Sequence, residues 1–181
     1  CLAFRIPRGV QRGIETGTQF YQYPSMAYGG INEIYAPAVL HHVGRIIEDE
    51  GYEAIPLGHQ SDWRGIDNDG NIRENYSKPV EEGKPQPDIM LHLRICGYLA
   101  GLGEIGYSKM LLTPEFGPMQ RVVFLFTDAE LEYDEMYNGE PLCRKCGACV
   151  RECPGGCIPA INSGKTVEVN LAGKILKWGD I

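Results

Sequence analysis

Five of the seven cysteines crowd into one short stretch near the end of the chain. Four of them, Cys143, Cys146, Cys149 and Cys153, follow the spacing C-x2-C-x2-C-x3-C-P, which binds a [4Fe–4S] cluster in bacterial ferredoxins. Three thiolates spaced in this way on a tight turn can each reach a different iron atom, and Gly147 lets the backbone fold closely around them. A zinc site instead joins two C-x2-C pairs across a longer span. The run therefore predicts a [4Fe–4S] cluster ligated by the first three cysteines.

The sequence leaves the fourth ligand of this cluster open. In two-cluster ferredoxins the cysteine before the proline ligates the other cluster, and this chain has no second run of the same spacing. A second run could lie beyond the sequence given; otherwise Cys153, Cys157, Cys96 or Cys1 could complete the site. We expect Cys96 and Cys1 to be small buried apolar residues instead. Thiolate ligands imply a reducing compartment, so the expected location is the cytoplasm.

Composition narrows the class of protein further. The 181 residues include 17 basic and 24 acidic side chains, for a net charge of −7, so we expect no general nucleic-acid binding, which needs a basic surface. No stretch approaches the roughly 18 apolar residues that a membrane-spanning helix requires. The first residue is cysteine rather than methionine, and we expect a fragment of a longer protein.

Hydrophobic patterning predicts the elements that must position the cysteine motif. The predicted helix at 33–50 has Asn32 as its cap and His42 as a core histidine on its apolar stripe. The stripe consists of Ile34, Tyr35, Ala38, Val39, His42, Val43, Ile46 and Ile47. The other expected elements are strands at 1–6, 52–56, 121–127 and 164–170, a helix at 89–100, an ordered loop at 7–30, a long polar loop at 58–88, and a solvated acidic loop at 128–140.

Several segments, in their order along the chain, resemble one known family. They are G-Y-E-A-I-P at 51–56, A-G-L-G-E-I-G at 100–106, T-P-E-F-G at 113–117, the strand that ends in T-D at 127–128, and the cysteine run. This succession resembles the corrinoid-dependent iron–sulfur reductases, which are the reductive dehalogenases and epoxyqueuosine reductases. The resemblance covers roughly residues 31–57 and 88–160. A lone G-L-G-x-x-G would also fit a dinucleotide-binding turn, but no convincing strand leads into it here.

The resemblance implies a fold and an activity. The expected fold class is α+β, with a nitroreductase-like core in a partial corrinoid-binding domain at 1–140 and a truncated ferredoxin-type [4Fe–4S] module at 141–181. The expected function is that of a cobalamin-dependent reductase passing electrons from the cluster to the corrinoid. A reduced ferredoxin or flavodoxin-type donor and a small-molecule or modified-nucleoside substrate would be its partners. The alternatives are a ferredoxin-like electron-transfer protein without catalysis and a cobalamin-handling module.

The resemblance also implies site residues. Close approach of a flat macrocycle needs backbone without side chains, which glycine provides. The expected corrinoid-binding residues are Gly101, Gly103, Gly106 and Tyr107, the last standing where dehalogenases often carry arginine. The expected catalytic residues are Tyr28 or Tyr35 as a proton donor, Asp88, and Lys109. Asp88 lacks the serine or threonine and the proline that follow the corresponding aspartate of epoxyqueuosine reductases. A plain glycine-rich turn between a helix and a strand is the competing interpretation of 101–106.

Overall fold

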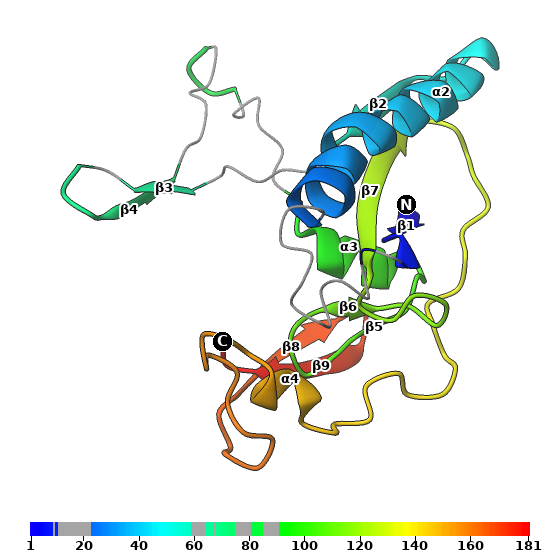
Figure 1. The fold of residues 1–181 in the computed structure, drawn as a ribbon. Helices are drawn as coiled ribbons and strands as arrows, with labels where there is room; N and C mark the ends of the chain where they lie inside the picture. Colours follow the sequence, from blue (N-terminus) through cyan, green and yellow to red (C-terminus); the bar gives the residue numbers. More distant parts are fainter. Residues whose placement is uncertain (9, 11–22, 59–63, 67, 75–80, 85–90) are drawn as a thin grey trace. The chain divides into compact units, whose positions relative to one another are not determined.

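The computed structural model describes residues 1–8, 10, 23–58, 64–66, 68–74, 81–84 and 91–181, and it describes the backbone alone for 23–28, 64–66 and 72–74 (Figure 1). The chain divides into two compact units, one made of Cys1–Gly58 with Leu93–Ile181 and the other of His59–His92. The site lies in the first unit.

A three-stranded antiparallel sheet forms one core of the first unit. Its central strand is β7 (Gln120–Thr127), whose first half pairs with β1 (Leu2–Arg5) and whose second half pairs with β2 (Ala54–Leu57). The register places Leu2 opposite Val123 and Ala54 opposite Thr127. A run of valine, phenylalanine and leucine suits a pleated and partly buried strand. The strands expected at 1–6, 52–56 and 121–127 are confirmed.

Helix α2 (Ala36–Asp49) packs on this sheet and follows directly from a π-helix, η1 (Tyr23–Tyr35) (Figure 1). The buried residues of α2 are Ala36, Leu40 and Gly44. Ala36 and Leu40 form a core cluster with Val123, and Gly44 faces the side chain of Leu125. Small residues at this interface bring the helix axis close to the sheet.

The helix expected at 33–50 is confirmed in position, and its expected buried face is wrong in part. Ile34 and Tyr35, at the end of η1, and Ile46 are exposed by 72%, 55% and 54%. Val39, Val43 and Ile47 of the expected stripe are half-buried, and the fully buried residues of α2 are Ala36, Leu40 and Gly44. His42 is also exposed, so it is not a core histidine. Asn32 is not a cap, because the chain is already helical there as part of η1; Asn32 is itself buried.

The loop expected at 7–30 is wrong over 23–30, where η1 lies, while residues 9 and 11–22 fall outside the described part. The loop expected at 58–88 contains an antiparallel hairpin of β3 (Arg64–Ile66) and β4 (Ile72–Glu74), with Gly70 in the left-handed conformation between the strands. Residues 128–140 form no helix or strand and are mostly exposed, as expected.

A second core of the first unit joins the middle of the chain to its end. Its buried residues come from α3 (Leu93–Leu99), β5 (Glu104–Ile105), β6 (Leu111–Leu112) and β9 (Lys174–Gly179). They are Tyr98, Ile105, Leu111 and Trp178. Strand β9 pairs with β8 (Thr166–Leu171), which confirms the expected terminal strand and adds its partner.

The described residues form both helices and antiparallel sheets. The nitroreductase-like core, the ferredoxin-type module and a boundary after residue 140 stay predictions. Within the parts of the chain that the structure describes, no helix is long and apolar enough to cross a membrane.

Candidate functional site

The cysteine segment is an irregular stretch of chain that leads into a short helix, α4 (Ala148–Arg151). Lys145 and Gly147 adopt left-handed backbone angles, with φ of 51° and 72°, and the backbone N–H groups of Val150 and Arg151 both donate to the carbonyl of Gly147. Glycine tolerates this conformation without steric cost. Gly147 therefore begins α4 as its N-cap, between the second and third cysteines of the motif.

All seven cysteines are free thiols. Cys143 and Cys149 are half-buried and Cys146 is exposed, so the motif offers accessible sulfur ligands of the kind that iron–sulfur clusters use. Among the described residues, however, no three cysteine, histidine, aspartate or glutamate side chains converge on a point that could hold a metal ion. The donor type and spacing thus fit a cluster, and the ligand set itself stays a prediction. The buried position expected for Cys1 is wrong, because Cys1 is exposed.

The last two cysteines of the segment lie together. The sulfur atoms of Cys153 and Cys157 are 3.4 Å apart, within hydrogen-bond distance for sulfur. Hydrogen bonds from the backbone N–H and the thiol of Cys157 lower the pKa of Cys153 to about 7, while the same thiol contact raises the pKa of Cys157. Cys157 therefore lies where it could take part in a site that includes Cys153.

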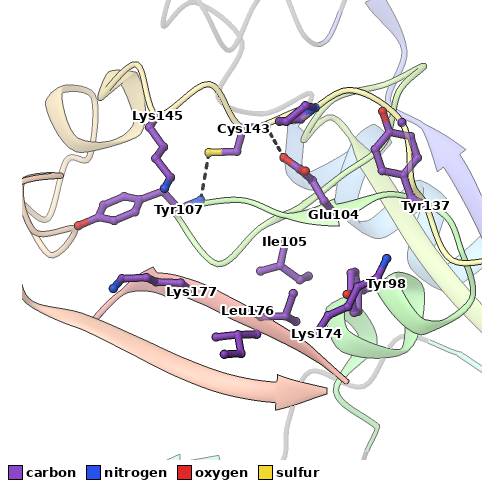
Figure 2. Close-up of a pocket in the computed structure, with 13 residues that line it drawn as sticks. Tyr98, Glu104, Ile105, Tyr107, Tyr137, Cys143, Lys145, Lys174, Leu176 and Lys177 are labelled. Carbon is purple, nitrogen blue, oxygen red and sulfur yellow. Dashed lines mark hydrogen bonds between the residues drawn. The ribbon is translucent and has the colours of Figure 1, made fainter. Parts of the chain in front are cut away.

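Cys143 is held by a segment that lies far from it in the sequence (Figure 2). The Glu104 carboxylate accepts a hydrogen bond from the backbone N–H of Cys143, and the backbone N–H of Tyr107 donates to the Cys143 sulfur at 3.3 Å. The sequence predicts Tyr107 as a corrinoid-binding residue and does not predict Glu104 as a site residue. No local spacing connects Glu104 with Cys143, which lies 39 positions away.

Tyr107 is fixed in place by two further hydrogen bonds. Its hydroxyl donates to the carbonyl of Ala160 at 3.1 Å, and its own carbonyl accepts the N–H of Gly179 at 2.9 Å. The residue is 5% exposed. Tyr107 therefore ties the turn after β5 to the segment beyond the cysteines and to the end of β9.

A cavity of about 380 Å³ lies beside Cys143. Three lysines, a glutamate and three tyrosines line it together with apolar residues; the polar set is Lys145, Lys174, Lys177, Glu104, Tyr98, Tyr107 and Tyr137 (Figure 2). Burial raises the pKa of Tyr98, which keeps its phenol neutral and able to donate. The volume lies near the lower limit for drug-sized ligands, so these residues could enclose only part of a corrinoid.

The three glycines expected to contact a corrinoid pack against this chain instead. A Cβ atom on Gly101 would lie 2.5 Å from the carbonyl oxygen of Glu135, and one on Gly103 would overlap the carbonyl oxygen of Leu112. A Cβ on Gly106 would meet the Leu112 side chain at 2.9 Å. Internal packing thus accounts for glycine at these positions, and their contact with a corrinoid stays a prediction.

Of the four expected catalytic residues, the structure describes the side chains of Tyr35 and Lys109, and these two lie in different cores. Tyr35 makes an edge-to-face contact with Phe4, at 5.3 Å between ring centroids, whereas the Lys109 ammonium lies 5.5 Å from the Trp178 ring centroid in the other core. The side chain of Tyr28 and the whole of Asp88 lie outside the described residues. The structure therefore gives no common site for Tyr35 and Lys109, and the roles expected for Tyr28 and Asp88 stay predictions.

Comparison with known proteins identifies relatives. The chain is 39% identical over 139 residues to the tetrachloroethene reductive dehalogenases of Desulfitobacterium hafniense and Dehalobacter restrictus, which covers 66% of this chain and 24% of theirs. It is 36% identical over 84 residues to that of Sulfurospirillum multivorans, covering 44% of this chain and 16% of the relative. No family model and no solved structure matches the chain.

The chain spans about a quarter of the length of the first of these relatives. It is related to the reductive dehalogenases, which are oxidoreductases, and this part of the expected resemblance is confirmed. The likeness to epoxyqueuosine reductases stays a prediction.

Proposed function

We propose that the chain is the iron–sulfur part of a corrinoid-dependent reductase related to the reductive dehalogenases. The observation that carries this proposal is the 39% identity over 139 residues to tetrachloroethene reductive dehalogenases. The ferredoxin-type spacing of the cysteines supports it independently, because that spacing is specific for a [4Fe–4S] cluster.

Cys143, Cys146 and Cys149 would hold the cluster, and Cys153 or Cys157 could supply a fourth thiolate. The cluster, when bound, supplies one-electron transfer. Around it, the chain donates a backbone N–H, that of Tyr107, to the sulfur of Cys143. Such donors stabilise negative charge on sulfur.

The corrinoid would be held by the whole protein rather than by this chain alone. The described residues would contribute one wall of the corrinoid site, namely the lining of the cavity beside Cys143. Tyr98 and the lysines of that lining carry hydrogen-bond donors. The corrinoid, when bound, supplies a cobalt centre that can reduce a small organic substrate. A modified nucleoside is a second substrate class within this proposal.

The electron donor would be a reduced ferredoxin or a flavodoxin-type carrier, which are acidic proteins. Residues 141–181 contain six basic and three acidic side chains, whereas the whole chain carries −7. Lys145, Lys174 and Lys177 line the cavity next to Cys143, and all three are exposed. Lys177 also forms an ion pair with Glu168 at 2.5 Å, which offsets its charge. Opposite charge steers an acidic carrier toward this part of the surface and falls off with salt. Reduced carriers and free thiols both suit the cytoplasm.

The experiment that tests this function is corrinoid retention by the full-length protein. After anaerobic iron–sulfur reconstitution, the protein is incubated with hydroxocobalamin and desalted, and corrinoid is measured by its visible spectrum. We expect about one corrinoid per chain and a spectral change when a reduced carrier is added. A protein that holds its iron but retains no corrinoid would instead be an electron-transfer protein without its own catalysis.

A further inference from the structure

Cys143 is bound through both its backbone N–H and its sulfur by a segment that lies far from it in the sequence. The N–H group is bound by the Glu104 carboxylate, and the sulfur accepts the N–H of Tyr107. Both partners come from one short segment that lies well before the motif in the chain. Figure 2 shows Cys143 between these two residues, with both interactions drawn.

The segment that holds Cys143 is itself rigidly placed. Glu104 and Ile105 pair with Leu112 and Leu111 in the β5–β6 hairpin, and Ile105 is buried in the second core. The turn closes with two hydrogen bonds, from Gly106 to the Met110 carbonyl and from Lys109 to the Gly106 carbonyl, each at 2.9 Å. The backbone that carries the Glu104 side chain is therefore held in place by the hairpin and the second core.

The other end of the segment is anchored to the chain that follows the motif. Tyr107 donates its hydroxyl to Ala160 and accepts the N–H of Gly179 through its carbonyl. Gly106 packs its Cα against the Cys143 side chain, where an added Cβ would lie 3.6 Å from the Cys143 Cβ. Cys143 is thus held by residues 104–107, which precede it in the sequence, and these are anchored in turn by Ala160 and Gly179, which follow it.

We propose that residues 104–107 form a clamp that positions Cys143 and, in the loaded protein, sets the potential of the cluster. Glu104 is its charged positioning residue. Only the electrochemical part of this proposal rests on the proposed function. The hydrogen bond from Tyr107 to sulfur favours the reduced, more negative state of a bound cluster, while the Glu104 carboxylate opposes it.

Two substitutions at Glu104 separate the hydrogen bond from the charge. Glu104→Gln keeps an oxygen that accepts the Cys143 N–H but removes the negative charge. Glu104→Ala removes both. Glu115 offers a matched control, because it is an exposed glutamate in the turn after β6.

The first test is amide hydrogen exchange in the cluster-free 181-residue chain, kept reduced and followed residue by residue. Loss of one hydrogen bond in Glu104→Ala should speed exchange of the Cys143 amide by about fivefold or more. Glu115→Ala should stay within about twofold of wild type, and Glu104→Gln, whose neutral oxygen is a weaker acceptor than a carboxylate, should give an exchange rate between those of wild type and Glu104→Ala. A Cys143 amide that exchanges equally fast in wild type and Glu104→Ala would overturn the clamp.

Circular dichroism checks that Glu104→Ala remains folded. Should it unfold, Cys143→Ala carries the same test in reverse, because removal of the sulfur acceptor should speed exchange of the Tyr107 amide. An unchanged Tyr107 amide in that variant would overturn the clamp.

The second test is the reduction potential of the reconstituted cluster. Glu104→Gln should shift it to a more positive value, and Glu115→Gln should leave it unchanged. A potential that Glu104→Gln does not move would refute the electrostatic role of Glu104. Failure of the wild-type chain to take up iron would count against the proposed function, while the exchange experiment would still decide the clamp.

Discussion

Replacing Gly103 by alanine is expected to disrupt the segment that holds Cys143. The added Cβ would overlap the carbonyl oxygen of Leu112 and would lie 2.9 Å from its carbonyl carbon and 3.1 Å from the Cα of Thr113. These are backbone atoms, so no rotamer change can relieve the overlap, and the β5–β6 pairing must open. Overpacking costs about 1–3 kcal/mol where side chains can adjust. We therefore expect a loss of about 3 kcal/mol or more in the free energy of unfolding.

Urea unfolding under reducing conditions, followed by circular dichroism, measures this loss. With a urea dependence of about 1–3 kcal/mol per molar, the midpoint should fall by about 1–3 M. Gly155→Ala is the matched control, because a Cβ at Gly155 would meet nothing within 4 Å; its midpoint should correspond to a change within about 0.5 kcal/mol. A Gly103→Ala chain that unfolds within 1 kcal/mol of wild type would refute this packing account.

Three further predictions concern the cysteine segment. Cys146→Ser should sharply lower the iron content and the sulfur-to-iron absorbance after reconstitution, whereas Cys1→Ser should leave both unchanged. Tyr107→Phe should lower the free energy of unfolding by about 1 kcal/mol through loss of one hydrogen bond, while Tyr133→Phe, at an 87% exposed residue, should not change it. In the cluster-free chain, iodoacetamide labelling of Cys153 should rise with pH around a midpoint near 7, because hydrogen bonds lower its pKa to about 7; a midpoint near 9 would contradict that contact.

The sequence predicts the strands of the fold well and the face of its main helix poorly. A run such as residues 121–127 is apolar on both sides of the strand, so its existence follows from composition alone. In α2, apolar residues are distributed over more than one face, and the choice between faces depends on how closely the helix can approach the sheet. Ala36 and Gly44 allow that approach. A prediction based on the spacing of large apolar residues does not take such small residues into account.

The glycines at 101, 103 and 106 illustrate a second limit. Their need for a bare backbone is readable from the sequence, but the atom that comes close is not. The family resemblance predicts that a corrinoid lies close to these glycines, whereas in the structure Glu135 and Leu112 lie close to them. Either neighbour is compatible with glycine at these positions, because the sequence does not say which atoms lie close to the glycine backbone.

Glu104 shows why a site cannot be fully assembled from motifs. Its partner lies 39 positions away and is a backbone N–H, which every residue except proline carries. Only the pairing of β5 with β6 and the packing of Tyr107 bring the two together. The cysteine motif, in contrast, is local and is recognised from its spacing.

The measurement that tests the central claim most directly is the content of iron, acid-labile sulfide and zinc in anaerobically reconstituted protein. A [4Fe–4S] cluster on Cys143, Cys146 and Cys149 predicts about four irons and about four sulfides per occupied chain, with no stoichiometric zinc. One zinc per chain without sulfide would contradict the cluster, and with it the proposal that this chain is the iron–sulfur part of a corrinoid-dependent reductase.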